Sequence, residues 1–164
     1  MSYGLKKEDD PILRQKALPV EEEEEAMEHA REVAEEMSRV RQENNGIGLA
    51  APQIGEPLRI INAVLRGREY TIINPYIKHR KGAVKVQESC LSLGNKVYEV
   101  KRPQRLTLYG EDIHGRPLKF RCRDVHETSV VEHEVDHLDG ILIDEKGTYC
   151  GTRAMDEKEK VAFG

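Results

Sequence analysis

Two histidines four residues apart are the first sign of chemistry in this chain. His133 and His137 enclose Glu134 in the stretch EHEVDHLDG. Residues four apart lie on one face of a helix, so two neutral imidazoles placed there can bind one metal ion. The carboxylate of Glu134 can then reach a water molecule on that ion. The spacing favours a hydrolytic metal site, with a buried helix whose histidines only make hydrogen bonds as the alternative.

A working metal site needs a third protein ligand and an open position for water. In one class of zinc proteases a third histidine follows, but Ile143 stands at that position and excludes the class. In other zinc proteases the third ligand is a downstream glutamate, and Glu157 lies in a polar stretch with little predicted structure to hold it. Cys90, in QESCLSLG, is the remaining candidate. A thiolate with two imidazoles suits iron, nickel, cobalt or zinc, whereas a lone buried cysteine is otherwise a small apolar residue.

A third segment supports the choice of Cys90. Residues 46–55 read GIGLAAPQIG, a glycine-rich turn with small side chains and one amide. Such a segment lets the backbone approach a ligand closely. Gln53 offers an N–H donor to an oxygen that becomes negatively charged during a reaction.

The elements that must hold these residues follow from periodicity. Residues 21–44 are predicted to form a long helix, because Met27, Ala30, Ala34 and Met37 recur at three- and four-residue intervals. Five short apolar runs separated by turns are predicted strands, at residues 58–64, 70–74, 83–86, 96–100 and 105–110. Residues 66–69 and 111–117 are predicted turns.

A last helix is predicted from Asp124 to about Leu138, with Asp124 and Glu127 as a capping box. Polar and apolar stripes cover two of its faces, which indicates burial in the middle of the fold. We therefore expect an α+β protein, with short antiparallel sheets around a central helix carrying HExxH and a long N-terminal helix. Residues 1–164 are expected to form one domain, with a polar tail from about residue 144.

Composition narrows the functional classes. The chain has 30 acidic and 26 basic residues and a net charge of -4, which argues against nucleic acid as a direct partner. No apolar run approaches the roughly 20 residues of a membrane span, so we expect no membrane contact and a cytoplasmic location. Three cysteines predict reduced thiols, and Cys122 and Cys150 lack ligand-like neighbours.

Three motifs together, GIGLAAPQ, ESCLS and EHEVDHL, resemble in order and spacing the signature motifs of peptide deformylases. The resemblance extends from about Pro11 to Ile143. It implies a metal-dependent hydrolase that removes the formyl group from the N-terminal formyl-methionine of newly made polypeptides and releases formate. It also implies one divalent metal ion, natively Fe²⁺, with Zn²⁺, Ni²⁺ or Co²⁺ as alternatives.

The resemblance assigns roles to residues of each motif. Cys90, His133 and His137 would hold the metal, and Glu134 would be the general acid and base. The side chain of Gln53 and the backbone N–H of Leu91 would stabilise the oxyanion. Gly48 would pair with the substrate backbone, and Ile47 would line the methionine pocket. To that pocket we add Val130, on the stripe of His133, and Val86. Outside the motifs, we expect Glu88 and Arg102 to pair and hold the cysteine loop.

The chain departs from the family pattern in places. Ser89 and Glu132 replace a usual glycine and glutamine, and Leu93–Gly94 replaces an apolar-proline pair. We do not expect the C-terminal helix by which bacterial members of the family dock on the ribosome. We still expect the protein to work near the ribosome. Two other functions stay open at this point: a metalloprotease, and a domain that binds metal or formylated chains without turnover.

Overall fold

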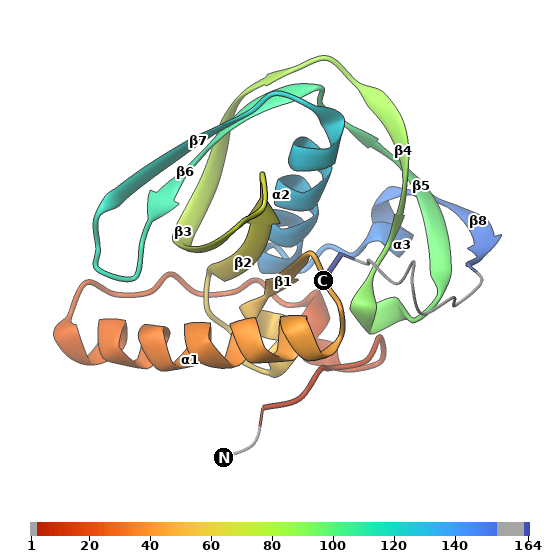
Figure 1. The fold of residues 1–164 in the computed structure, drawn as a ribbon. Helices are drawn as coiled ribbons and strands as arrows, with labels where there is room; N and C mark the ends of the chain where they lie inside the picture. Colours follow the sequence, from red (N-terminus) through yellow and green to blue (C-terminus); the bar gives the residue numbers. More distant parts are fainter. Residues whose placement is uncertain (1–2, 154–162) are drawn as a thin grey trace.

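The computed structural model describes residues 3–153 and 163–164. In this part of the chain, eight strands form two antiparallel sheets around one buried helix (Figure 1). The larger sheet has the order β1 (Gly48–Ala50), β2 (Ile60–Leu65), β3 (Arg68–Lys81), β6 (Arg105–Glu111) and β7 (Pro117–Cys122). The smaller sheet has the order β4 (Val84–Ser89), β5 (Lys96–Arg102) and β8 (Thr148–Thr152). The helices are α1 (Glu24–Glu43), α2 (Val125–Leu138) and α3 (Ile143–Lys146), with short 3₁₀ turns η1 (Pro11–Arg14), η2 (Ala51–Ile54) and η3 (Leu91–Leu93).

Helix α2 forms the centre of the fold. Its start is capped by Asp124, whose side chain accepts a hydrogen bond of 2.9 Å from the Glu127 N–H. Eleven of its fourteen residues are buried, and it contacts strands of both sheets. Burial on all sides explains why its hydrophobic residues do not form a single stripe. The predicted α+β class is confirmed, and the helix carries both histidines of the HExxH motif.

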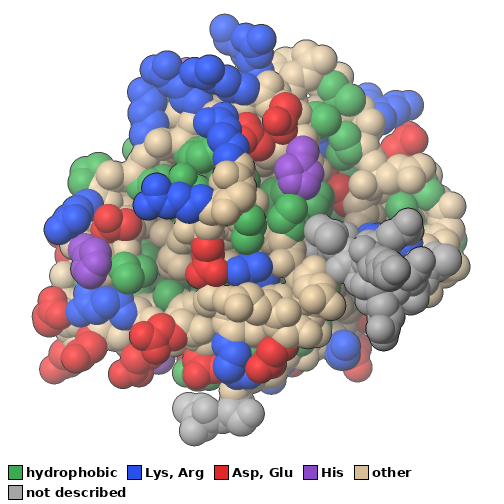
Figure 2. All heavy atoms as spheres, viewed as in Figure 1, with side chains coloured by type: hydrophobic (Ala, Val, Ile, Leu, Met, Phe, Trp, Pro, Cys, Tyr) green, Lys and Arg blue, Asp and Glu red, His purple; other side chains and the backbone are tan. Residues whose placement is uncertain are grey.

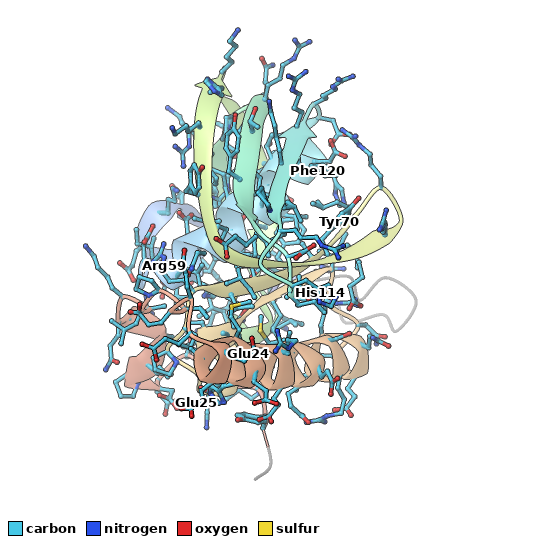
Figure 3. All side chains as sticks on the ribbon, turned by 90° about the vertical axis from the view of Figure 1, so that its left-hand side faces the viewer. Glu24, Glu25, Arg59, Tyr70, His114 and Phe120 are labelled. Atoms are coloured by element: carbon cyan, nitrogen blue, oxygen red, sulfur yellow. The ribbon has the colours of Figure 1, made fainter. Side chains whose placement is uncertain are left out.

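Helix α1 lies below the larger sheet in Figure 1 and matches the predicted helix, except that it begins at Glu24. Its apolar side packs into a cluster with residues of η2, β2 and β3. Glu24 and Glu25, labelled in Figure 3, are exposed in its first turn, where negative charge stabilises the helix dipole. Figure 2 shows acidic side chains along this lower edge and Lys and Arg side chains gathered at the opposite end.

Strand β3 is longer than predicted, because residues 75–81 continue the strand that was expected to end at residue 74. Asn74 and His79 have positive φ angles of 52° and 59°, and the pairing with β6 shifts register near both. These irregularities bend the strand, and its second half lacks apolar alternation. Strands β1 and β7 were not predicted, β1 because it lies in the glycine-rich segment and β7 because it alternates with charged residues.

The prediction of a polar tail from residue 144 was wrong for residues 144–153. There the chain continues α3 and then forms β8, which pairs with β5. An edge strand is held by backbone hydrogen bonds, so it needs few apolar side chains. Residues 154–162 of the expected tail lie outside the described residues, and the single-domain organisation stays a prediction. No helix in the described part of the chain is long and apolar enough to span a membrane.

Candidate metal centre

Cys90, His133 and His137 meet at one buried point. One ligand atom from each, the Cys90 sulfur and one ring nitrogen of each histidine, lies within 4.8 Å of the other two. All three residues are buried, and the Cys90 Sγ lies 3.5 Å from the His137 Nε2. A converging set of one thiolate and two imidazoles fits a single divalent metal ion with a position left for water. Cys90 and the two histidines, which were predicted to act together, therefore lie together in space.

Two separate elements bring these ligands together. His133 and His137 are one turn apart on α2, so their rings extend from one face, with centroids 5.1 Å apart. Cys90 follows the last residue of β4 and precedes η3. Pairing of β4 with β5 fixes the end of the strand, because Glu88 lies opposite Tyr98 in the register. The sulfur is thus positioned by a sheet and the imidazoles by a helix.

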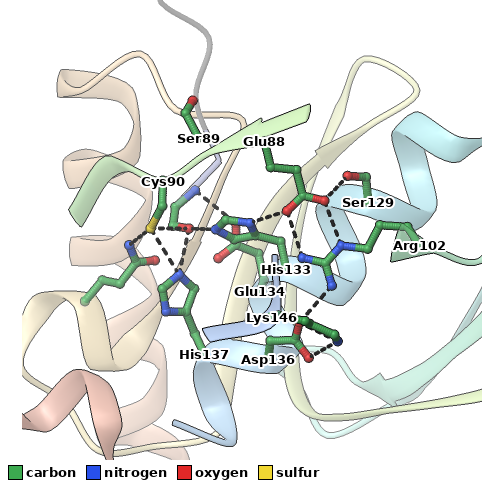
Figure 4. A network of polar contacts seen from close by, with 12 residues as sticks. Glu88, Ser89, Cys90, Arg102, Ser129, His133, Glu134, Asp136, His137 and Lys146 are labelled. Atoms are coloured by element: carbon green, nitrogen blue, oxygen red, sulfur yellow. Dashed lines mark hydrogen bonds and ion pairs between the residues drawn. The ribbon is translucent and has the colours of Figure 1, made fainter. Parts of the chain in front are cut away.

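A buried ionic network contacts His133 on its Nδ1 side, away from the other two ligands, and orients the ring (Figure 4). The Nδ1 of His133 lies 2.8 Å from a carboxylate oxygen of Glu88. Arg102 donates to both oxygens of Glu88, at 2.7 and 2.8 Å, and Ser129 donates to one of them at 2.5 Å. The side chains of Glu88 and Arg102 are completely buried, so the predicted pair is present. A carboxylate that accepts the Nδ1 proton directs the Nε2 lone pair of a histidine toward a metal.

The network reaches the surface through Asp136. Arg102 donates to this carboxylate at 2.7 Å, and Lys146 of α3 donates to it at 2.9 Å. The link ties α3, next to the smaller sheet, to the helix that carries the histidines. Ser129 and Lys146 had not been predicted; the only signal in the sequence was that Ser129 precedes His133 by four residues and thus shares its helix face.

Glu134 lies beside the three ligands without a partner for one of its oxygens. Its side chain is fully buried, and among the described residues its Oε1 makes no hydrogen bond. Gly48 of β1 packs directly against it, since a Cβ built on Gly48 would lie 2.5 Å from the Glu134 Oε2. An unpaired buried carboxylate oxygen costs free energy, which points to a functional reason for its position. Only glycine at position 48 leaves enough space for the Glu134 carboxylate in this position.

Gln53 and the N–H of Leu91 supply hydrogen-bond donors near Cys90. The side-chain nitrogen of Gln53 lies 3.9 Å from the Cys90 sulfur and donates to Ser92 at 3.1 Å, while its oxygen accepts from the Ala50 N–H at 3.0 Å. These two contacts fix which end of the amide faces the sulfur. Leu91 begins η3, where the first N–H groups have no partner within the turn.

The apolar residues predicted for a side-chain pocket divide into two groups. Val130 is fully buried on α2, and Ile47 packs against the same apolar cluster. Val86 lies in β4 opposite Val100, half-buried, and among the described residues it does not belong to that cluster. The structure therefore brings Ile47 and Val130 together in one apolar cluster and places Val86 outside it.

Burial and charge shift the pKa values of the ionisable groups at the centre. Burial raises the pKa of Glu134 to about 7, against the opposing electrostatic effect of the neighbouring His133. Burial also lowers the pKa of His137 to about 3, which favours the neutral imidazole that binds metals. Burial would raise the pKa of Glu88, but the hydrogen bonds from Arg102 and His133 outweigh it and hold the value at about 2. Glu88 is thus ionised.

The two other cysteines lie apart from this cluster, as predicted. Cys122 is buried at the end of β7, where burial raises the pKa of its thiol to about 12. Cys150 is exposed in β8. Glu157, the alternative third ligand, lies outside the described residues.

The fold brings together a candidate metal site on an HExxH helix, with a ligand set that suits a metal-dependent hydrolase. The family model described as polypeptide deformylase matches residues 3–150. A peptide deformylase of Dictyoglomus thermophilum is 41% identical over 143 residues, which cover 87% of this chain and 91% of that protein.

Solved structures show the same similarity. A crystal structure of the peptide deformylase from Thermus thermophilus superposes with a TM-score of 0.80 and 39% identity, covering 88% of this chain and 84% of that one. The enzyme of the Vibrio parahaemolyticus bacteriophage VP16T, solved in complex with actinonin, has a TM-score of 0.79 and 29% identity, covering 85% and 99%.

The chain belongs to the polypeptide deformylase family. These enzymes are metal-dependent hydrolases that remove the formyl group from the N-terminal methionine of newly made polypeptides. The predictions of family, fold class and activity are therefore confirmed.

Proposed function

We propose that Cys90, His133 and His137 hold the catalytic metal of this deformylase and that Glu134 is its general acid and base. One observation carries the proposal: three potential ligand atoms converge beside a buried carboxylate that has an unpaired oxygen. The ligand set fits a metal, because a thiolate and two imidazoles are all donors that bind divalent transition metals.

We propose Fe²⁺ as the native metal, with Zn²⁺, Ni²⁺ or Co²⁺ able to replace it. A sulfur ligand makes the site softer than three imidazoles would, and all four ions accept such a set. When bound, the metal would lower the pKa of water to near neutrality and polarise the formyl oxygen. Fe²⁺ and a thiolate are both sensitive to oxidation, which would make the iron form lose activity in air.

The residues around the ligands would then perform the proton transfers. Glu134 would take a proton from the attacking water, since its raised pKa of about 7 matches a group that both accepts and returns a proton. The side-chain N–H of Gln53 and the backbone N–H of Leu91 would donate to the oxyanion that forms on the formyl carbon. One such donor lowers the barrier by about 3 kcal/mol. Glu134 would finally protonate the leaving amine.

The substrate would be a newly made chain that begins with formyl-methionine. We propose that its backbone pairs with Gly48 and that its methionine side chain lies against Ile47 and Val130. Val86 was also predicted for this pocket, and we keep it only as a more distant contact. Because such chains emerge from ribosomes, we propose a cytoplasmic location and work near the ribosome, without direct binding to nucleic acid.

Formate release from formyl-Met-Ala-Ser by the Fe²⁺- or Ni²⁺-loaded protein under reducing conditions tests these roles. Glu134→Ala should retain the metal and lose turnover, whereas Cys90→Ser should lose metal. Equal turnover in the wild type and Glu134→Ala would reject the assignment of the general base. Full metal content in Cys90→Ser would instead favour another third ligand, such as the one the metalloprotease alternative requires.

A further inference from the structure

Residues Phe163 and Gly164 lie inside the metal centre. The chain end marked C in Figure 1 lies near β1 and α2. Phe163 forms a parallel β-bridge with Cys90, and its carbonyl oxygen accepts a hydrogen bond of 2.8 Å from the Leu91 N–H. The segment thus lies alongside the cysteine loop.

Gly164 contacts the groups that we assign to the chemistry. Its N–H donates to the Glu134 Oε2 at 3.1 Å. Its main-chain oxygen lies 2.7 Å from the His137 Nε2 and 3.3 Å from the Cys90 Sγ, and it also contacts the His133 Nε2. This oxygen lies at the point on which the three ligand atoms converge, where the metal itself would bind. In the metal-loaded protein it could remain only as a further ligand, in the open position that the substrate formyl group needs.

The fit of Gly164 is specific for glycine. A Cβ built on Gly164 would collide with the Gly48 carbonyl oxygen and the Leu49 Cα, and would lie 2.7 Å from the Gln53 Oε1. Two of these three neighbours are backbone atoms, which cannot move aside easily. Any larger residue at position 164 would therefore be expelled from the centre.

Phe163 fills apolar space next to the same ligands. Its ring lies edge-on to His133, with centroids 5.3 Å apart, and near His126 at 6.3 Å. It packs against the apolar cluster that contains Val130, the residue that we place in the methionine pocket. The segment therefore occupies the space of the reacting formyl group and the space that we assign to the methionine side chain of the substrate.

We propose that Phe163–Gly164 is an internal ligand of this deformylase that competes with the formyl-methionyl substrate. The proposal rests on the proposed function, because it uses the same ligands, general base and pocket. The segment is part of the chain, so its binding is intramolecular and corresponds to an effective concentration in the millimolar range. Substrate must then bind to the fraction of molecules in which the segment is displaced, which raises KM without changing kcat.

Kinetics of the metal-loaded full-length protein test the competition. Gly164→Val should lower KM for formyl-Met-Ala-Ser, by roughly tenfold if the segment is bound in nine molecules of ten, and leave kcat unchanged. Gly4→Val is the matched control, because the space around Gly4 is open, and it should keep the KM of the wild type. An unchanged KM in Gly164→Val would mean that the segment does not block the site, and a higher KM would mean that the segment helps to form it. Either result would overturn the proposal.

A fluorescence measurement tests displacement without relying on turnover. The chain contains no tryptophan, so Phe163→Trp creates a single reporter. In the Zn²⁺-loaded protein its emission should be blue-shifted from that in urea. Titration with the product peptide Met-Ala-Ser should move the emission toward the value in urea as the segment leaves. If the emission before peptide is added already equals the value in urea, the segment is not docked. If added peptide does not change the emission, the segment is not displaced. Either result would overturn the proposal.

The two proposals fail in different ways. If neither the wild type nor Gly164→Val releases formate, the assigned catalytic roles are wrong, and the emission of Phe163→Trp still reports whether the segment docks. If the wild type turns over normally while both the KM comparison and the emission show no competition, only the internal ligand is rejected.

Discussion

The Nδ1 of His133 and the carboxylate of Glu88 lie 2.8 Å apart, with both side chains buried. Glu88 is in turn held by Arg102 and Ser129, so its position is determined by two other elements of the fold. A histidine whose ring is fixed in this way presents Nε2 with one orientation and one tautomer. This contact connects the smaller sheet to the chemistry of α2.

The first prediction concerns this contact. Glu88→Gln should weaken metal binding about 10- to 100-fold, because an amide cannot replace the negative charge behind the histidine. Competition with a chromophoric chelator measures the change in affinity. Glu127→Gln is a matched control, since Glu127, which lies on α2, is another buried carboxylate paired with an arginine, Arg66. Equal losses in both variants would mean that Glu88 has no special link to the metal.

The second prediction concerns stability. Arg102→Met would leave Glu88 buried without its cationic partner, and removing one partner of a buried ion pair costs about 3 to 5 kcal/mol. Urea unfolding of the metal-free protein should show a loss of that order. Arg39→Met, which removes exposed pairs with Glu36 and Glu43 on α1, should leave the unfolding curve nearly unchanged. If Arg102→Met changed the unfolding curve as little as Arg39→Met, the buried network of Arg102 and Glu88 would add little stability.

The third prediction separates activity from folding. Gly48→Ala places a methyl group 2.5 Å from the Glu134 Oε2, and the flexible end of that side chain can move aside. We expect the free energy of unfolding to change by less than about 1 kcal/mol. Displacing the proposed general base by about 1 Å should lower kcat about 100-fold. Gly4→Ala, in open space, should keep full activity. Wild-type kcat in Gly48→Ala would contradict the tight packing of β1 on Glu134.

Much of the site could be predicted from residue types and spacing. His133 and His137 are four residues apart on one helix, so their convergence follows from helix geometry, and Glu134 directly follows His133. Cys90 lies 43 residues before His133, and no local pattern connects the two; the resemblance of three ordered motifs made that connection. The pair of Glu88 and Arg102 was predicted because Glu88 lies close in sequence to Cys90 and Arg102 is a cation just beyond the next strand.

The parts that were missed depend on backbone pairing or on long-range contacts. Strand β8 has a polar sequence and exists because β5 offers an open edge, which periodicity cannot detect. Strand β3 extends past Asn74 through two register shifts, where the alternation of side chains is lost. The position of Phe163–Gly164 depends on the shape of a site formed by other segments, so no property of the dipeptide itself predicts it.

The last prediction concerns pH and the link between α3 and η1. Hydrogen bonds from Arg14 lower the pKa of Asp144 below the ordinary value of 3.8. A carboxyl group whose pKa is lower in the folded chain stabilises the fold above its unfolded pKa, and that contribution is lost as the pH falls through the folded pKa. Asp144→Asn should therefore destabilise the protein at pH 6 and have a smaller effect at pH 2.

Solvent limits the size of this effect. The side chains of Arg14 and Asp144 are 37% and 26% exposed, so we expect a loss of less than about 1 kcal/mol at pH 6. Urea unfolding of wild type and variant at both pH values measures it, with the exposed Asp9→Asn as the control for removal of one negative charge. A loss that is equal at pH 6 and pH 2 would mean that Asp144 acts through packing, because only the ionised carboxylate can attract Arg14.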